Sequence, residues 1–224
     1  MPNLANEELV NLQSSSKVKV NNSKIYVLTK RVVDILGSLS GIILLSILFL
    51  VTAIAIKVED PKGPVFFTQK RVGKNGKEFN MYKFRSMVSD AEEKLQELLK
   101  LNETTGAMFK MKDDPRVTKI GRIIRKTSID ELPQLLNVLK GEMSLVGPRP
   151  PLPREVKDYT TYDLQRLLVV PGCTGLWQVS GRSNIGFEEM VELDLKYIEK
   201  RSLYFDMKII FKTSLILLGS KGAF

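Results

Sequence analysis

The hydropathy pattern of the chain is dominated by one long apolar run. No charged side chain interrupts residues 35–56 (ILGSLSGIILLSILFLVTAIAI), and the charged residues Asp34 and Lys57 bound them. In a helix this run is roughly 30 Å long, about the thickness of one hydrocarbon core. Such a run is unusual in the core of a soluble protein. We therefore predict one membrane-inserted helix at residues 29–57, preceded by a polar tail at residues 1–28.

Both flanks of this predicted helix are basic, which bears on how it enters the membrane. The basic flanking residues are Lys24, Lys30 and Arg31 on one side and Lys57, Lys62, Lys70, Arg71 and Lys74 on the other. Short flanks rich in lysine and arginine stay in the cytoplasm, so a spanning helix would carry one of them across. A re-entrant helix, which enters and leaves by the same face, would not. Charge favours re-entry and length favours spanning, so both remain open.

A short hairpin is predicted directly after the membrane segment. Residues 65–72 and 78–85 have strand patterns and flank Asn75-Gly76, a strong hairpin signal. Lys83 and Arg85 are expected to share one face of the second strand, because side chains alternate along a strand.

A basic stripe follows in the middle of the chain. Arg116, Lys119, Arg122 and Arg125 recur every third residue, with valine and isoleucine side chains between them. The pattern predicts a helix with one basic and one apolar face, which suits an anionic membrane or a bound phosphate. A basic face that is merely solvated is the alternative.

Three further segments have helical patterns, namely residues 89–101, 186–201 and 205–219. The second is amphipathic and carries Asp194, either as a further acidic site residue or as a solvated charge. The third is largely apolar and predicts an interfacial helix or, almost equally well, a core helix. Together the patterns predict a mostly helical α+β fold. It is expected to be a membrane protein with one N-terminal re-entrant or spanning hydrophobic helix, a small β-hairpin and amphipathic interfacial helices, and the re-entrant form would make it monotopic.

Composition narrows the chemistry that this chain can perform. The 224 residues carry a net charge of +9, no histidine and a single cysteine, Cys173. The lack of histidine excludes His-based triads and the usual zinc ligand sets, and one cysteine makes no intramolecular disulfide. Catalysis therefore has to rest on carboxylates and oxygen ligands, which favour a hard cation such as Mg²⁺. The positive charge indicates an anionic partner, such as a phosphorylated substrate, lipid headgroups or nucleic acid.

Two adjacent carboxylates are the candidate chemistry. Asp130 and Glu131 lie in RKTSIDELPQLLNVLKGEMSLVGPRP, which is residues 125–150. Pro133 is tolerated only in the first turn of a helix, so Asp130 is expected near a helix N-terminus and Gly141 at the C-terminal end. An N-cap at Asp130, with Glu131 as a favourable first-turn charge, would explain the pair without any chemistry.

The same stretch closely resembles the signature of the bacterial sugar transferases, the monotopic polyprenyl-phosphate phosphoglycosyl transferases. Other pieces match in order, namely KRVVDILGSLSG, GPVFFTQKRVGKNGKEFNMYKFRSM, TKIGRIIRKTSIDELPQ and VPGCTGLWQVSGR. The likeness covers about residues 29–218. It implies that residues 58–224 form a cytoplasmic catalytic sugar transferase domain at the inner face of a bacterial cell membrane.

The resemblance implies a reaction and a role for each carboxylate. Members of this family move a phosphosugar from a nucleotide diphosphate sugar to a polyprenyl phosphate. Asp130 is then expected to be the nucleophile and Glu131 to help hold Mg²⁺. Attack by Asp130 on the sugar-bearing phosphorus gives an acyl phosphate and releases UMP from a UDP-sugar. The product on undecaprenyl phosphate would initiate an exopolysaccharide, a capsule or a related glycan, while the sugar cannot be read from these residues.

The resemblance also indicates substrate-binding residues, which fall into three pairs. They are Lys83 and Arg85 for the phosphates, Arg125 and Arg149 for the diphosphate or nucleotide, and Gln178 and Arg182 for the lining of the same pocket. A structural salt bridge is the alternative role for each arginine.

One departure from the family concerns the break in the membrane segment, where Ser46-Ile47 replaces the usual Ser-Pro pair. Breaking the helix must then come from packing and from Ser46. The chain otherwise resembles the minimal catalytic form, without the extra N-terminal membrane helices of larger members.

The expected partners are a UDP-sugar, a polyprenyl phosphate and the membrane, without nucleic acid, and the sequence is compatible with a homo-oligomer. Two rival functions are a non-catalytic, basic, membrane-anchored scaffold and a glycosyltransferase that releases UDP.

Overall fold

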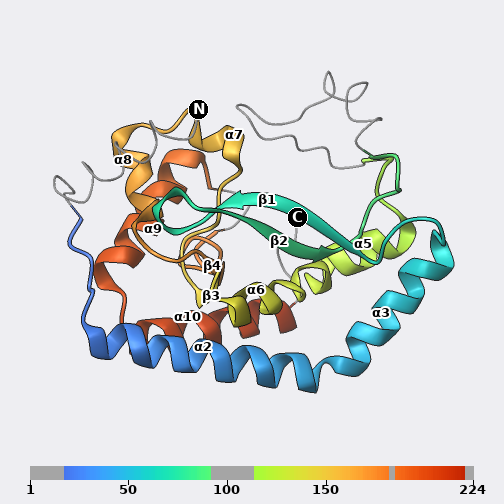
Figure 1. Ribbon diagram of the computed structural model, residues 1–224, viewed down its shortest axis with the longest axis horizontal. Helices are drawn as coiled ribbons and strands as arrows, with labels where there is room; N and C mark the ends of the chain where they lie inside the picture. The colour runs from blue at the N-terminus through green and yellow to red at the C-terminus, as the bar shows by residue number, and fades with distance from the viewer. Residues whose placement is uncertain (1–17, 92–113, 182–184, 220–224) are drawn as a thin grey trace.

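Helices make up most of the computed structural model in Figure 1, which describes residues 18–91, 114–181 and 185–219. The helices are α2 (Lys24–Leu44), α3 (Ser46–Glu59), α5 (Lys119–Lys126), α6 (Gln134–Lys140), α7 (Pro153–Val156), α8 (Thr161–Leu164), α9 (Phe187–Lys200) and α10 (Leu203–Leu218). Short 3₁₀ turns are η1 (Lys74–Gly76), η3 (Ile129–Glu131) and η4 (Gln165–Leu168). The strands are β1 (Phe66–Val72), β2 (Glu78–Phe84), β3 (Ser144–Val146) and β4 (Gly172–Thr174). The predicted mostly helical fold with a small hairpin is confirmed.

The long apolar run forms a bent pair of helices along the lower edge of Figure 1. Helices α2 and α3 meet at Leu45 with a bend of 60°. Within the described part of the chain, no single helix is long and apolar enough to cross a membrane. The bent pair taken together has the length and the composition of a membrane segment. The break lies beside Ser46, where the resemblance placed it, although Ile47 replaces the proline. Helix α2 begins at Lys24, inside the segment assigned to the polar tail.

Polar side chains and a close approach fasten α2 to the rest of the protein. Arg31 donates hydrogen bonds of 2.6 and 2.7 Å to two carbonyls near the end of α6. The Asp34 carboxylate accepts from the Ser144 hydroxyl at 3.0 Å and from the Leu145 N–H at 2.9 Å, both in β3. At Gly37 a Cβ would lie 2.7 Å from Leu145 Cδ1, so the helix passes close to a side chain of β3 at this position. The first half of the apolar run therefore lies against the protein rather than apart from it.

The predicted hairpin is confirmed. Strands β1 and β2 pair antiparallel, with a register that runs from Phe66 opposite Phe84 to Val72 opposite Glu78. Between them Asn75 and Gly76 have φ angles of 56° and 73°, the left-handed region that asparagine and glycine adopt readily.

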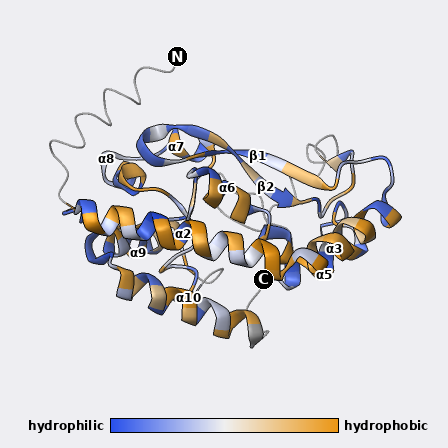
Figure 2. Ribbon diagram, turned by 60° about the horizontal axis from the view of Figure 1, so that its bottom comes forward, coloured by the Kyte–Doolittle hydropathy of each residue, from blue (hydrophilic) through white to orange (hydrophobic). Residues whose placement is uncertain are grey.

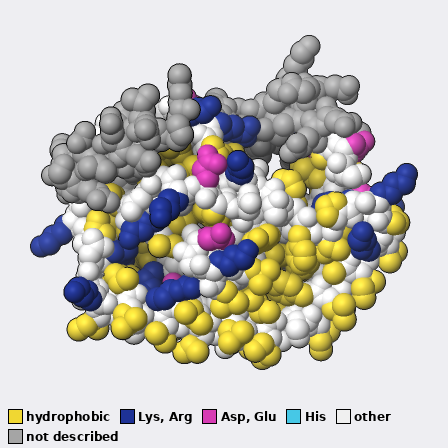
Figure 3. Space-filling model, viewed as in Figure 1, with side chains coloured by type: hydrophobic (Ala, Val, Ile, Leu, Met, Phe, Trp, Pro, Cys, Tyr) yellow, Lys and Arg dark blue, Asp and Glu magenta, His cyan; other side chains and the backbone are white. Residues whose placement is uncertain are grey.

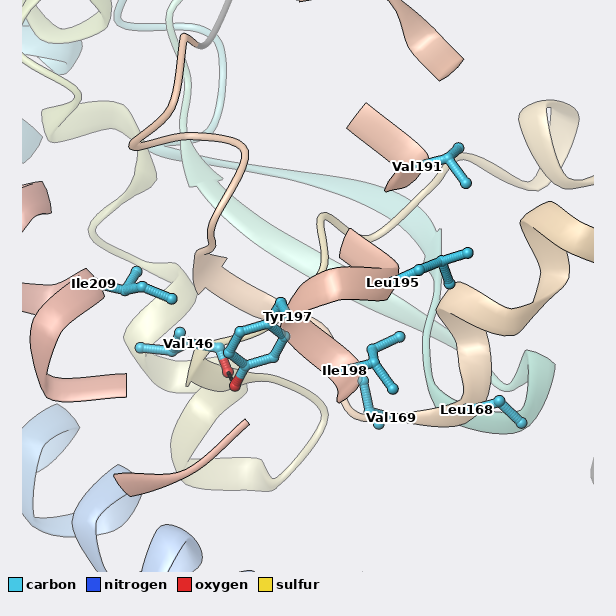
Figure 4. Close-up of a cluster of buried hydrophobic side chains, with 8 residues drawn as sticks. All are labelled: Val146, Leu168, Val169, Val191, Leu195, Tyr197, Ile198 and Ile209. Carbon is cyan, nitrogen blue, oxygen red and sulfur yellow. Dashed lines mark hydrogen bonds between the residues drawn. The ribbon is translucent and has the colours of Figure 1, made fainter. Parts of the chain in front are cut away.

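A second, parallel pair of strands was not predicted from the sequence. Ser144 and Val146 of β3 pair with Gly172 and Thr174 of β4. Figure 4 shows the core cluster beside this pair, which consists of Val146, Leu168, Val169, Val191, Leu195, Tyr197, Ile198 and Ile209. The Tyr197 hydroxyl donates a hydrogen bond of 3.0 Å to the Val146 carbonyl, so the one polar atom of this ring is satisfied. This core joins β3 to α9 and α10.

Large apolar side chains remain exposed on α2, α3 and α10. Figure 2 shows by colour that hydrophobic residues are frequent along these three helices. The most exposed on α2 and α3 are Ile25, Leu28, Leu36, Ile43, Leu44, Ile47, Leu50 and Val58, and those on α10 are Tyr204, Met207, Phe211 and Leu215. Helix α10 is thus two-sided, because Asp206 and Ile209 are buried on its other face. An exposed apolar surface of this extent is typical of a membrane or protein contact. Insertion into a membrane stays a prediction at this point.

We predict that Ile47→Pro folds with a stability close to that of the parent chain. Ile47 is the second residue of α3, and proline is tolerated in a first turn, where an N–H has no intrahelical acceptor. Ile54→Pro, in the middle of the same helix at another exposed position, is expected to lose about 3 kcal/mol. Denaturant unfolding in detergent micelles measures both. Equal losses in the two variants would mean that α2 and α3 are one continuous helix.

Candidate active site

The two adjacent carboxylates lie on a 3₁₀ turn rather than on the helix itself. Turn η3 contains Asp130 and Glu131, and α6 begins only at Gln134, with Pro133 as its N-cap. Ser128 enters the turn with a φ of 57°, a left-handed conformation that reverses the chain after α5. Asp130 therefore lies near a helix N-terminus, as predicted, but it is not the N-cap that the alternative without chemistry requires. Gly141 ends α6 with a φ of 82°, also as predicted. A helix cap therefore does not explain why Asp130 and Glu131 are present.

Lys83 of β2 lies between the two carboxylates. Its Nζ is 2.7 Å from Glu131 Oε1 and 3.7 Å from Asp130 Oδ2. The Asp130 side chain is only 11% exposed, whereas that of Glu131 is 47% exposed. The Lys83 ammonium group thus pairs with two neighbouring carboxylates, of which Asp130 is buried and Glu131 is accessible.

The environment of Asp130 opposes its ionisation. Burial raises the pKa of this carboxyl above its ordinary value, and the charge of Glu131 acts in the same direction. Lys83 and Arg125 lower the pKa but do not outweigh burial. The ionised form of Asp130 is therefore held in a site that disfavours it, a common property of functional carboxylates.

Arg125 joins Asp130 and Lys83 from the end of α5. Its Nε donates a hydrogen bond of 2.8 Å to the hydroxyl of Ser86, and its charge acts on Asp130. The basic stripe is partly helical, as predicted, because α5 contains Lys119, Arg122 and Arg125. Arg116 precedes the helix and pairs with Asp114 at 2.6 Å. Of the predicted stripe, only Arg125 is brought to the carboxylates.

Arg85, in contrast, points to a different partner. Strand β2 ends at Phe84, so the alternation that was to place Arg85 beside Lys83 stops one residue earlier. The Arg85 Nη1 lies 2.6 Å from Asp60 Oδ2, and its side chain is only 7% exposed. Its guanidinium is thus held at the end of α3, in the structural role that the sequence left open.

Arg149 belongs to a second cluster of charges. Its Nη1 lies 3.1 Å from Glu155 Oε2, and 22% of its side chain is exposed. The Arg166 side chain donates to the Arg149 carbonyl at 3.3 Å and pairs with Asp194 at 2.6 Å. Both members of the Arg166–Asp194 pair are completely buried, so Asp194 is not the solvated charge that was one of its two interpretations. This pair holds the loop that presents Arg149.

The last two predicted binding residues follow β4. Gln178 lies in the turn after this strand, and its Oε1 is buried without a hydrogen-bond partner in the described part of the chain. Arg182 lies outside the described residues. Cys173, in β4, packs against the apolar cluster of Phe79, Met81, Val138 and Met143. Burial raises the pKa of its thiol, which disfavours a nucleophilic thiolate.

Sequence reasoning missed three residues that shape this region, namely Arg71, Glu155 and Arg166. Arg71 is buried and donates to the Pro150 carbonyl at 2.9 Å, beside the Arg149 loop. In the sequence each of the three is one charged residue among many. Only Glu155 had a local signal, because it follows Pro153 by two residues and accepts from the Leu152 N–H at 2.8 Å, as a first-turn acid does.

The side chains around the dyad can be compared with the ligands that the predicted magnesium ion needs. Within residues 18–91, 114–181 and 185–219 there is no cluster of three or more histidine, cysteine or acidic side chains that would hold a metal. The dyad offers two carboxylates, with Glu131 the more accessible. Mg²⁺ is usually bound by one or two carboxylates and keeps its other positions for water and substrate phosphates. The residues therefore fit a magnesium ion that shares its coordination with a bound diphosphate, and its binding stays a prediction.

The face of the molecule seen in Figure 1 carries many basic side chains, and its lower edge is apolar. Figure 3 shows basic side chains around a few acidic ones on this face, with a band of hydrophobic side chains along its lower edge, where α2 lies in Figure 1. The arrangement brings a charged site and an apolar surface together on one small protein.

Comparison with known proteins agrees with the resemblance in the motifs. The family described as bacterial sugar transferase matches residues 25–220. A galactosyl transferase, CpsE, from Streptococcus agalactiae is 50% identical over 201 residues, which are 88% of this chain and 44% of CpsE. An undecaprenyl-phosphate galactose phosphotransferase from Salmonella typhimurium is 45% identical over 87% of this chain and 41% of its own length. The chain thus spans less than half the length of these two relatives.

A shorter relative is covered almost completely. The exopolysaccharide production protein ExoY from Rhizobium meliloti is 40% identical over 201 residues, which are 88% of both chains.

We predict that Asp130→Asn stabilises the fold at neutral pH. Because burial raises the folded-state pKa of Asp130 above its unfolded value, ionisation costs stability once the pH rises through the folded pKa. Asparagine has the same shape and carries no charge. The gain in melting temperature over the parent chain is expected at pH 7 and should shrink as the pH falls toward about 4.

Glu199→Gln, on the exposed face of α9, is the matched control and is expected to change little at either pH. A lower melting temperature of Asp130→Asn at pH 7 would contradict this account of the site.

Proposed function

The chain belongs to the bacterial sugar transferase family, and from this premise we propose that it transfers a sugar 1-phosphate from a UDP-sugar to undecaprenyl phosphate with release of UMP. The names of the relatives support this proposal, since they include an undecaprenyl-phosphate galactose phosphotransferase and a UDP-galactose-lipid carrier transferase. The observation that carries it is the dyad itself. Asp130 is buried beside Glu131, and Lys83 and Arg125 supply positive charge at the same place.

The first half of the proposed reaction uses Asp130 as a nucleophile. One carboxylate oxygen attacks the phosphorus that bears the sugar, a P–O bond forms, and the bond from this phosphorus to UMP breaks with its electron pair on UMP. The product on the protein is an aspartyl phosphosugar. An ionised carboxylate needs no general base, which suits a chain without histidine. Because the Asp130 side chain is only 11% exposed, little solvent has to be removed before it attacks.

In the second half, the phosphate of undecaprenyl phosphate attacks the same phosphorus. The Asp130–phosphorus bond breaks, Asp130 regains its carboxylate, and undecaprenyl diphosphosugar leaves. The lipid phosphate is already ionised and needs no base either. Both steps bring an anion toward an anion, so the cations at the site have to offset this repulsion.

Lys83 and Arg125 are the side chains placed to provide that compensation. Lys83 already contacts both carboxylates, and Arg125 acts on Asp130 from the end of α5. Magnesium held by Glu131 would supply further positive charge to the diphosphate. Arg149 follows β3 and Gln178 follows β4, and both are proposed to contact the nucleotide.

The exposed apolar surface supports attachment to a membrane. It covers the outer faces of α2, α3 and α10, and Ile123 on α5 is also 58% exposed. Both ends of the bent pair return to the same body of the protein. Before α2, Asn21 accepts hydrogen bonds through its carbonyl from Arg201, and after α3, Asp60 pairs with Arg85. This favours a re-entrant segment and a monotopic protein on the cytoplasmic face of a bacterial cell membrane.

We predict that the protein and a UDP-sugar, without lipid, release up to about one UMP per active site and retain a phosphosugar on Asp130. Intact-mass spectrometry detects the adduct, and a panel of UDP-sugars identifies the sugar. Asp130→Asn is expected to form neither product while it remains folded. If UMP appears only when both substrates are present and no adduct is trapped, direct transfer is the mechanism. Release of UDP instead would make the protein a glycosyltransferase.

Glu131→Gln separates the metal from the nucleophile in the same assay. We expect it to need a higher Mg²⁺ concentration for UMP release, because one carboxylate ligand is replaced by a weaker amide. Parent-like activity at low Mg²⁺ would remove Glu131 from the metal site.

A re-entrant segment makes a clear prediction for chemical labelling in intact cells. Single cysteines at Lys19 and Lys74, two exposed positions on either side of the bent pair, are introduced in a Cys173→Ser background. A membrane-impermeant thiol reagent is expected to label neither site before lysis and both sites after it. Labelling of Lys19→Cys in intact cells would show that the segment spans the membrane.

A further inference from the structure

Two acidic residues at the end of α3 make contacts that the catalytic scheme does not use. The Glu59 carboxylate accepts hydrogen bonds from the N–H groups of Lys119 at 2.7 Å and Ile120 at 2.9 Å. These are the first two residues of α5, whose N–H groups have no intrahelical partner. A negative charge is also favourable at a helix N-terminus. Glu59 thus fixes the start of the helix that leads to the dyad.

Asp60, the next residue, holds the end of β2 through the side chain of Arg85. Its carboxylate lies 2.6 Å from Arg85 Nη1, and its backbone carbonyl accepts from Arg85 Nη2 at 2.8 Å. The guanidinium passes over Gly63, where a Cβ would lie only 1.6 Å from Nη1. Arg85 follows Lys83 by two residues, so this contact anchors the end of the strand that carries the lysine of the site.

The two anchored elements also pack directly on each other. At Gly121 of α5 a Cβ would lie 2.0 Å from the backbone oxygen of Ser86, so the helix touches the chain just after β2. The Thr118 N–H donates to the same oxygen at 3.1 Å. Neither element can shift without the other.

An apolar core beneath these contacts reaches the dyad turn. Ile56 of α3, Phe84 of β2 and Ile124 of α5 are buried together. Phe49 of α3 packs edge-on against Phe84, with ring centroids 5.2 Å apart. The partly buried side chains around this core include Ile129 and Leu132, which flank Asp130 and Glu131. Helix α3 is therefore packed under the turn that carries both carboxylates.

We propose that Glu59 and Asp60 are positioning residues, which lock the end of the bent membrane segment to α5 and β2 and so set the spacing of Asp130, Glu131 and Lys83. Neither residue touches the carboxylates of the site. Their effect passes through the elements that they hold, so the seating of α3 determines the geometry at the dyad. The catalytic consequence rests on the proposed function, whereas the structural coupling is independent of it.

The test uses the full chain in lipid nanodiscs with the variants Glu59→Gln and Asp60→Asn, which keep the side-chain shapes. Glu78→Gln is the matched control, because it removes the exposed 3.6 Å pair with Lys70 on the same hairpin. With undecaprenyl phosphate present, so that the enzyme turns over, we expect kcat for UMP release by the first two variants to fall about tenfold to a hundredfold, the effect typical of a small misplacement of reacting groups. KM for the UDP-sugar is expected to change little, because these residues do not contact it. The control should behave as the parent chain.

Hydrogen exchange supplies the readout that does not depend on activity. Peptides that cover residues 127–132 are expected to exchange faster in Glu59→Gln and Asp60→Asn than in the parent chain or in Glu78→Gln, while the melting temperature stays similar. An unchanged kcat in an active parent background would overturn the positioning role. If the parent chain releases no UMP from any UDP-sugar, the proposed function fails, and unchanged exchange at residues 127–132 would then overturn the coupling by itself.

Discussion

The docking of α2 through Arg31 and Asp34 is the interaction on which the rest of the arrangement depends. Arg31 donates hydrogen bonds to two carbonyls near the end of α6, the helix that follows the dyad turn. Asp34 accepts hydrogen bonds from a hydroxyl and an N–H in β3. A buried polar group that loses its partner costs about 1–3 kcal/mol, so α2 cannot leave without exposing several of them. The helix is thus part of the domain and not a tether. Its outward apolar face consequently has a fixed place relative to Asp130.

The site itself is governed by the placement of a few charges at different depths. Asp130 is buried, Glu131 is accessible, and Lys83 lies between them. Without a cation, two adjacent carboxylates beside a diphosphate would repel it strongly. Within the proposed reaction, the same lysine and Arg125 neutralise the dyad before substrate binds and the diphosphate afterwards. Because these two cations compensate the negative charge in both states, the proposed phosphoryl transfer needs no histidine.

Several features could be predicted because they are local. The apolar run, the Asn75-Gly76 hairpin and the glycine that ends α6 each depend on residues close together in the chain. The dyad and its lysine were found through linked motifs, and the structure brings Lys83 and Arg125 to Asp130. Arg85 could not be placed, because the strand ends one residue before it and its partner lies 25 positions earlier in the chain. Asp194 could not be placed either, since an ionisable residue on an amphipathic helix looks solvated until a buried arginine faces it.

The sequence by itself determined the hairpin and the longer helices, which stretch is apolar enough for a membrane, and which residue types are present for chemistry. These properties follow from neighbours within a few positions, where backbone preference and hydropathy act. The tertiary structure alone decided the partner of each charge and the direction of each apolar face. Lys83 meets Glu131 across 48 positions, and Asp34 meets Leu145 across 111. Coulomb attraction and hydrogen bonding depend on distance in space. That distance is set only when α3, β2 and α5 have packed around one core and α2 has docked on α6 and β3.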